Sequence, residues 1–198
     1  MANKKTRPLD KKEFEKIIKT IGEGFTHPSG ERYRGNERIK NCLLCEYYLG
    51  IRIGDVCNLK LNDILMQNGK WRLNIIEQKT GKARNFIVPS EVYMFLQDYA
   101  LRNNIKPTQR LFDISVRTVQ NHLQRTCEYL GITGVGTHSF RKTFSQEIYN
   151  DPEVGNDILL IQELLQHASV NTTRAYLSVS SKKVEQALQG HVSNMLQS

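Results

Sequence analysis

The sequence of 198 residues lacks any long hydrophobic run, and this absence excludes several classes of protein. No stretch approaches the roughly 18 apolar residues that a membrane-spanning helix needs. The first residues, MANKKTRPLDKKEF, are basic, but no apolar stretch follows them, so we do not expect a secretory signal. Internal repeats, low-complexity tracts and a proline-rich linker are also absent. We therefore expect a cytoplasmic protein with one large domain or two small ones.

Cysteine is scarce, with four residues in the whole chain. Cys42 and Cys45 have CxxC spacing, but they fall inside a helical pattern, and the sequence offers no second CxxC or histidine pair at zinc spacing. Free cysteine behaves as a small buried hydrophobe. We therefore expect thiols in the core, a reducing compartment and no metal site.

Acidic residues are outnumbered by basic ones, 20 against 28, which leaves a net charge of +8. A surplus of this size favours polyanions, because phosphate contacts release counterions. Composition alone leaves a second interpretation open, namely a basic and merely soluble surface.

Hydrophobic periodicity predicts a mainly helical (α+β) fold with one small antiparallel sheet. Asp10 and Glu13 have the spacing of a capping box, and an apolar stripe starts at Phe14. Further helices are predicted at about 37–49, 90–100, 115–131, from 138, at about 156–166 and at 181–197. The runs WRLNII and ARNFIVP read as a β hairpin, joined by EQKTGK with a turn glycine at Gly81.

The segment GTHSFRKTF at 136–144 places His138 three residues before Arg141. Side chains at this spacing lie on the same flank of a helix, so both can donate to a single anion. Taken alone, the pair also fits an ordinary helix start.

Other residues extend this pair into a candidate site. Arg52 lies in a turn after a helix, three residues before Asp55, and a carboxylate beside an arginine usually holds it in place. Lys79 lies at the tip of the hairpin, where Lys82 competes for the same role. A second histidine and a tyrosine follow near the C-terminus, His167 at a helix end and Tyr176 nine positions later.

Each of these residues has an ordinary structural explanation as well. Arg52 and Asp55 fit a surface ion pair, and Lys79 fits a solvated hairpin tip. His167 fits a partner of a helix C-terminus through the helix dipole. Tyr176 is one of eight tyrosines, most of which would pack in the protein. The order and spacing of the whole set therefore carry the argument.

The ordered set resembles the catalytic domain of the tyrosine recombinases, also called the phage integrase family. Four segments over about residues 8–190 carry the resemblance: GIRIGDV at 50–56, KTGK at 79–82, HSFR at 138–141, and LLQH at 164–167 followed by Thr173 and Tyr176. Gln166 stands where the family frequently has glycine, and Asp55 stands where glutamate is common. Family members usually carry a helical core-binding domain ahead of the catalytic one, whereas this sequence starts almost at the catalytic domain.

The resemblance implies an enzyme that cuts and rejoins DNA at specific sites through a 3′-phosphotyrosine intermediate, with no metal, ATP or other cofactor. The tyrosine would be the nucleophile, the two arginines would neutralise the phosphate, and the lysine would protonate the leaving 5′-oxygen. The implied catalytic residues are Arg52, Lys79, His138, Arg141, His167 and Tyr176, with Asp55 in a supporting role. Four basic residues are candidates for contacts with the DNA backbone: Lys82, Arg84, Lys142 and Arg174.

The expected partners are double-stranded DNA and further copies of the chain, as a tetramer in the synaptic complex, with the protein at the nucleoid. Residues 1–8 would form an N-terminal arm, 9–180 the catalytic domain and 181–198 a tail helix. The tail would either be exchanged between protomers or pack on its own domain. Two other functions share these features, namely a type IB topoisomerase-like activity and a DNA-binding regulator without catalysis. Tyr176 and the two arginines argue against the regulator.

Overall fold

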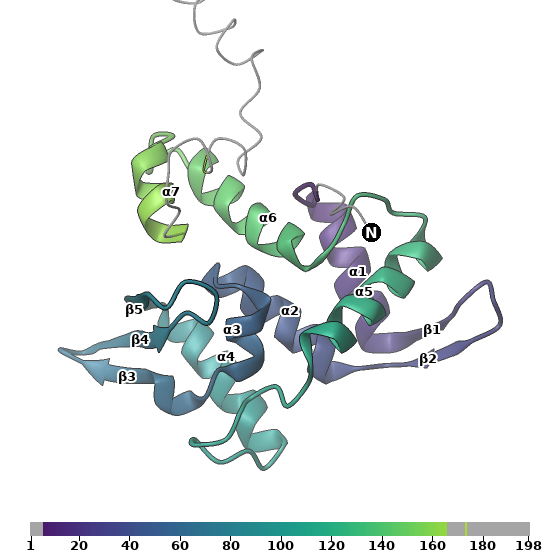
Figure 1. Ribbon diagram of the computed structural model, residues 1–198, viewed down its shortest axis with the longest axis horizontal. Helices are drawn as coiled ribbons and strands as arrows, with labels where there is room; N and C mark the ends of the chain where they lie inside the picture. The colour runs from purple at the N-terminus through teal and green to yellow at the C-terminus, as the bar shows by residue number, and fades with distance from the viewer. Residues whose placement is uncertain (1–5, 166–172, 174–198) are drawn as a thin grey trace, which may run out of the picture. The chain divides into compact units, whose positions relative to one another are not determined.

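The computed structural model describes residues 6–165 and Thr173, and the chain divides into two compact units, Met1–Phe144 and Ser145–Ser198. The first unit contains α1 (Lys11–Glu23), α2 (Glu37–Leu49), α3 (Ile53–Asn58), a short 3-10 turn (Leu61–Asp63), α4 (Ser90–Arg102) and α5 (Val116–Leu130). Helix α6 (Thr137–Asn150) begins in the first unit and ends in the second, which also holds α7 (Ile158–Leu165). Figure 1 shows these elements.

Local capping signals fix the ends of several helices where the sequence predicts them. The side chain of Asp10 accepts a hydrogen bond from the backbone N–H of Glu13 at 2.8 Å, and the capping box is complete. Ser115 caps α5 in the same way. Helices α2 and α5 end at Gly50 and Gly131, both in the left-handed conformation that glycine adopts most easily.

Helix α2 is the central helix of the first unit. Its buried residues occupy several faces: Ile39, Asn41, Cys42, Leu43, Leu44, Cys45, Glu46 and Leu49. All four cysteines of the chain are buried and free, which confirms the expectation of core thiols. Among the described residues, none of the helices is long and apolar enough to cross a bilayer.

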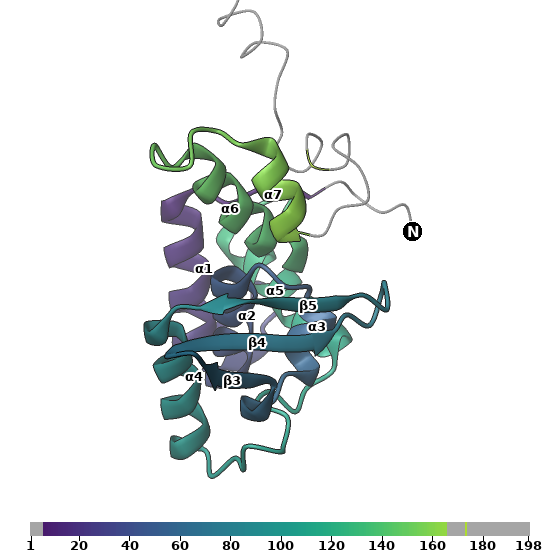
Figure 2. The ribbon, with the colours of Figure 1, turned by 90° about the vertical axis from the view of Figure 1, so that its left-hand side faces the viewer.

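The predicted hairpin is present as β4 (Lys70–Ile76) and β5 (Ala83–Val88), and it belongs to a three-stranded antiparallel sheet. Strand β3 (Ile64–Gln67) pairs with β4, an addition that the sequence did not suggest. Figure 2 looks onto this sheet, with α2 and α3 behind it. The buried side chains Leu73 and Val88 lie on the covered face. The fold class is confirmed as mainly α with small antiparallel sheets.

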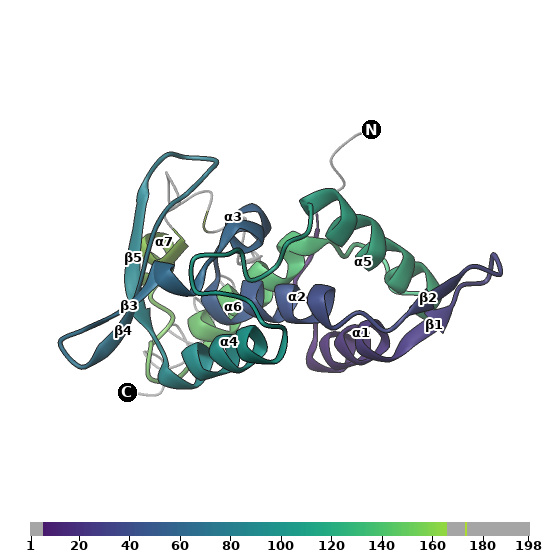
Figure 3. The ribbon, with the colours of Figure 1, turned by 90° about the horizontal axis from the view of Figure 1, so that it is seen from below.

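A two-stranded ribbon, β1 (Gly24–Thr26) and β2 (Arg32–Arg34), was also missed. Its paired aromatic residues Phe25 and Tyr33 stack at 4.8 Å between ring centroids, and Phe25 stacks on Tyr129 of α5 at 4.9 Å. Seen from below in Figure 3, the ribbon and the three-stranded sheet lie at opposite ends of the first unit. The expected tail helix at 181–197 lies outside the described residues.

Candidate active site

Arg52 is held at the short connection between α2 and α3. Its neighbours Ile51 and Ile53 are buried, at 0% and 5% exposure. The carbonyl of Arg52 accepts hydrogen bonds from the backbone N–H groups of Asp55 and Val56, which start α3. Two buried anchors and the first turn of a helix therefore fix the backbone from which the guanidinium extends.

The ion-pair partner of Arg52 is Glu77 at the end of β4, a residue that sequence reasoning missed. Nη1 of Arg52 lies 2.5 Å from Oε2 of Glu77, and the carboxylate is fully buried. The expected partner, Asp55, instead accepts a hydrogen bond from the backbone N–H of Gln78 at 2.9 Å. Asp55 therefore ties α3 to the base of the hairpin, and Glu77 holds the arginine.

The hairpin turn that carries Lys79 is closed by the backbone of Glu77. The N–H of Glu77 donates to the carbonyl of Lys82, and the N–H of Gly81 donates to the carbonyl of Glu77. Gly81 has a φ of 65°, as the left-handed turn position requires. Lys79 and Lys82 are both exposed, so either ammonium group can reach a ligand above the hairpin.

Arg84 lies inside the hairpin. It is 1% exposed, its Nη1 is 3.8 Å from Oε1 of Glu77, and its guanidinium carbon lies 5.2 Å from the ring centroid of Phe86. Burial and the neighbouring Arg141 lower the pKa of Arg84 to about 10, which leaves it charged at pH 7. Arg84 therefore supports the hairpin from within, whereas the sequence suggested a surface contact with DNA.

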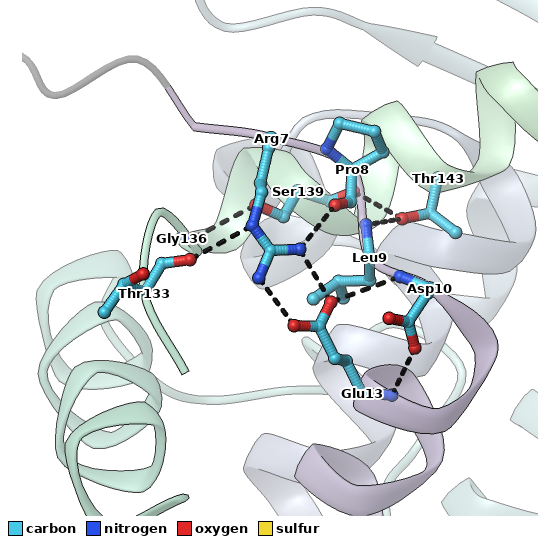
Figure 4. A network of polar contacts seen from close by, with 9 residues as sticks. All are labelled: Arg7, Pro8, Leu9, Asp10, Glu13, Thr133, Gly136, Ser139 and Thr143. Carbon is cyan, nitrogen blue, oxygen red and sulfur yellow. Dashed lines mark hydrogen bonds and ion pairs between the residues drawn. The ribbon is translucent and has the colours of Figure 1, made fainter. Parts of the chain in front are cut away.

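The start of α6 is fastened by the N-terminal segment, as Figure 4 shows. The backbone N–H of Leu9 donates to the hydroxyl of Thr143 at 2.8 Å. Nε of Arg7 donates to the carbonyl of Thr133, and its terminal nitrogens donate to the carboxylate of Glu13 at 2.5 and 2.6 Å. The segment before α1 therefore fixes the turn of α6 on which the histidine and arginine of the candidate site stand.

Lys142 takes part in the same attachment. It is 7% exposed, and its ammonium group donates to the carbonyl of Thr6. The sequence suggested a contact with the DNA backbone for this lysine, but the structure places it largely inside the protein.

His138 lies where several positive charges meet. Desolvation lowers the pKa of His138 below its ordinary value of 6.5, although the residue keeps an exposed surface, and four cationic side chains lower it further: Arg141, Lys79, Arg52 and Lys142. These side chains come from α6, the hairpin and the α2–α3 connection. The structure therefore brings together four of the six predicted catalytic residues, Arg52, Lys79, His138 and Arg141.

Arg141 is 1% exposed and lies near a second buried carboxylate, Glu46 of α2. Burial raises the pKa of Glu46 well above its ordinary value, and the charge of Arg141 opposes that shift. The two groups therefore lie close enough for the charge of Arg141 to act on the carboxyl group of α2. Glu46 was not predicted as part of the site.

The remaining predicted residues, His167, Arg174 and Tyr176, lie outside the described residues, as does Gln166. Thr173, part of the same sequence segment, is described and fully buried. The predicted roles of the histidine and the tyrosine therefore stay predictions.

The similarity to known proteins extends over the residues of the candidate site. The sequence profile described as "Phage integrase family" matches residues 7–183. The chain belongs to the phage integrase family. Among its relatives, Tyrosine recombinase XerA of Pyrococcus furiosus is 30% identical over 188 residues, and XerH of Campylobacter jejuni is 31% identical over 165 residues. The matches cover 88% and 78% of this chain, but only 63% and 45% of the respective relatives.

Solved structures of integrase-family proteins share the fold. A XerH recombinase solved with a palindromic difH substrate in a post-cleavage complex aligns with a TM-score of 0.65 at 22% identity, over 94% of this chain and 53% of that one. The catalytic domain of bacteriophage HP1 integrase aligns with a TM-score of 0.60 at 18% identity, over 93% and 94% of the two chains. The chain thus shares the fold of the HP1 domain over nearly the full length of both chains.

Proposed function

We propose that this chain is the DNA strand-transfer part of a site-specific tyrosine recombinase or integrase. The observation that supports this most strongly is the gathering of Arg52, Lys79, His138 and Arg141, whose charges act together on the histidine. A site rich in fixed cations is suited to a phosphodiester, on which negative charge develops during transfer. The relatives named above are tyrosine recombinases, and a XerH recombinase of the same fold was solved with a palindromic difH substrate.

In the proposed reaction, the hydroxyl of Tyr176 gives its proton to a neighbouring base and its oxygen attacks the scissile phosphorus. The bond to the 5′-oxygen breaks, and that oxygen takes a proton from Lys79. The guanidinium groups of Arg52 and Arg141 neutralise the non-bridging oxygens, because a planar fork can grip two of them at once. His138 is neutral at pH 7 in the free protein, so its ring can donate a hydrogen bond to the same phosphate or accept a proton there. The phosphotyrosine conserves the bond for rejoining.

The proposed partners are double-stranded DNA and further copies of the protein, assembled as a tetramer when two duplexes are paired. Relatives solved with DNA support the first part: a lambda integrase dimer was solved on a COC′ core site. Action on DNA would place the protein in the compartment that holds the DNA, in keeping with the cytoplasmic and nucleoid location expected from the sequence.

The test is a covalent adduct with nicked duplexes of randomised sequence, which removes the need to know the target site. Wild-type protein should form an adduct that survives a denaturing gel, and peptide mapping should place the DNA on Tyr176. Tyr176→Phe removes one oxygen and should abolish the adduct, while Tyr149→Phe should not. An adduct that persists in Tyr176→Phe, or that maps to another tyrosine, contradicts the proposal.

A further inference from the structure

Glu77 is completely buried, and its carboxylate has charged and polar neighbours. Its side chain is 0% exposed. Oε2 accepts hydrogen bonds from Nη1 of Arg52 at 2.5 Å and from the hydroxyl of Thr80 at 2.7 Å, and Oε1 faces Arg84 at 3.8 Å. A buried carboxylate is tolerated only when such partners replace its hydration.

These neighbours keep Glu77 ionised. Burial acts to raise its pKa, but the hydroxyl of Thr80 and the positive charges of Arg52 and Arg84 hold the pKa of Glu77 below its ordinary value of 4.5. Several directional contacts at once fix the position of this charged and enclosed carboxylate. Arg52 gains a rigid partner on the protein side of its guanidinium.

The two arginines that share Glu77 differ in what they can reach. The side chain of Arg84 is 2% exposed and that of Arg52 is 17% exposed. Arg84 therefore serves as an internal counter-charge. Among the described residues, the guanidinium of Arg52 donates a hydrogen bond to Glu77 through Nη1 only. Its other N–H groups therefore remain for an anion at the surface.

We infer that Glu77 is a positioning residue, which fixes the guanidinium of Arg52 for the scissile phosphate and acts on the reaction through that arginine. The inference rests on the proposed function. Glu77 touches no substrate in this scheme. Its contribution comes from holding one donor in a productive geometry, where a displacement of about 1 Å can cost on the order of 100-fold in rate.

The test is a double-mutant cycle on the single-turnover cleavage rate, with Glu77→Gln, Arg52→Ala and the pair. A 5′-phosphorothiolate substrate is used, because its sulfur leaves without protonation and effects on Lys79 then drop out. Glu77→Gln should slow cleavage by on the order of 10-fold or more in the wild-type background. In the Arg52→Ala background it should slow cleavage no further, because the residue through which it acts is gone.

Asp98→Asn is the control, since it breaks an exposed Arg–Asp pair on α4, which takes no part in the proposed site. It should leave the cleavage rate unchanged. Multiplicative effects of Glu77→Gln and Arg52→Ala would overturn the inference, as would a normal cleavage rate in Glu77→Gln.

A second measurement needs no DNA, so it separates this inference from the proposed function. In the wild-type protein, the ion pair should slow rotation of the Arg52 guanidinium and give resolved ¹⁵Nη signals in NMR spectra at pH 7. Glu77→Gln, where it folds, should merge these signals. Averaged Arg52 signals in the wild type, or signals that stay resolved in Glu77→Gln, would refute the positioning role even if the protein forms the Tyr176 adduct.

Discussion

The imidazole of His138 is the most sensitive probe of charge in the candidate site. Its pKa lies below 6.5 because of desolvation and the four neighbouring cations, so the ring is neutral at pH 7. A phosphate placed among these cations would offset their repulsion and favour the protonated ring. We predict that NMR titration of the free protein gives a midpoint below 6.5, and that a short duplex raises it.

His122 is the control, because burial alone lowers its pKa. Its midpoint should not change with DNA. Since the folded pKa of His138 lies below the unfolded value, its contribution to stability is complete above pH 6.5 and is lost as the pH falls through the folded pKa. A free-protein midpoint at or above 6.5, or one that DNA does not move, would argue against the site.

The two predicted chemical roles, charge neutralisation and proton donation, can be separated by substrate. Arg52→Ala and Arg141→Ala should each lose cleavage by about 10²–10³-fold or more, because each removes a donor to developing charge. Lys79→Ala should lose activity on an ordinary phosphodiester and regain it on a 5′-phosphorothiolate, whose leaving group needs no acid. The measurement is the single-turnover rate on both substrates.

Lys82→Ala is the control for Lys79, because both lysines are exposed on the same turn. It should not show the substrate-dependent rescue. Rescue of Lys82→Ala instead of Lys79→Ala would reassign the acid, and rescue of an arginine variant would remove the distinction between the roles.

Sequence reasoning located the residues expected to meet the phosphate, but it missed Glu77 and placed Arg84 at the surface. Glu77 follows Leu73 and Ile75 at two-residue spacing, and Arg84 precedes Phe86 and Val88 at the same spacing. Side chains that alternate in this way share one face of a strand, so the parity placed both charges on the covered face. That signal was available in the sequence. The contact between Glu77 and Arg84 could not be predicted from the sequence, because it depends on the register of β4 against β5, in which Ile75 faces Arg84.

At the scale of elements, Gly50 determines how α2 passes into the connection that carries Arg52. It has a φ of 59°, and a Cβ there would lie 2.1 Å from Cε1 of Phe144. Gly50→Ala therefore adds a steric overlap to the strain of the left-handed conformation. We predict a loss of unfolding free energy on the order of 3 kcal/mol, measured by urea denaturation.

Gly131 offers a matched comparison, because it ends α5 at a φ of 67° and a Cβ there would meet nothing within 4 Å. Gly131→Ala should cost only the conformational strain, about 1 kcal/mol. Equal losses in the two variants would mean that Phe144 does not pack against Gly50 as described.

The N-terminal attachment of α6 should respond to acid through Glu13. The hydrogen bond from Arg7 lowers the pKa of Glu13 below 4.5, so the stabilisation is present above the unfolded pKa and disappears as the pH falls through the folded one. The pair is partly solvated, so Glu13→Gln should cost about 1 kcal/mol or less at pH 7. We predict that the difference in melting temperature between Glu13→Gln and wild type shrinks as the pH falls below 4.5. A constant difference down to pH 3 would exclude the ion pair as its cause.

The helices were predictable because their signals are local. Caps such as Asp10 and Ser115, and stop glycines such as Gly50, each act within a few residues. The β1–β2 ribbon has strands of three residues in a polar stretch, and its aromatic pair gains its packing from α5, distant in sequence. Strand β3 likewise exists through its pairing with β4. Such tertiary contacts leave no local pattern.

At the scale of the whole molecule, the net charge of +8 should make DNA binding strongly dependent on salt. Each phosphate contact releases counterions, so the logarithm of affinity should fall linearly with the logarithm of salt concentration, with a slope of about −0.9 per contact. The measurement is a fluorescence titration of a labelled duplex at several salt concentrations. A slope near zero would remove the electrostatic basis of the proposed function.

Single substitutions then show which charges meet the DNA, since burial divides the candidates. Lys82 is exposed, so Lys82→Ala should reduce the magnitude of the slope by about 0.9 if this lysine contacts a phosphate. Lys19→Ala should leave the slope unchanged, because Lys19 lies on α1, away from the sheet (Figure 3). Arg84→Met should also leave the slope unchanged wherever the variant folds, because the side chain of Arg84 is 2% exposed and its charge faces Glu77 inside the hairpin. A reduced slope in Arg84→Met but not in Lys82→Ala would mean that the hairpin opens on DNA and presents its inner face.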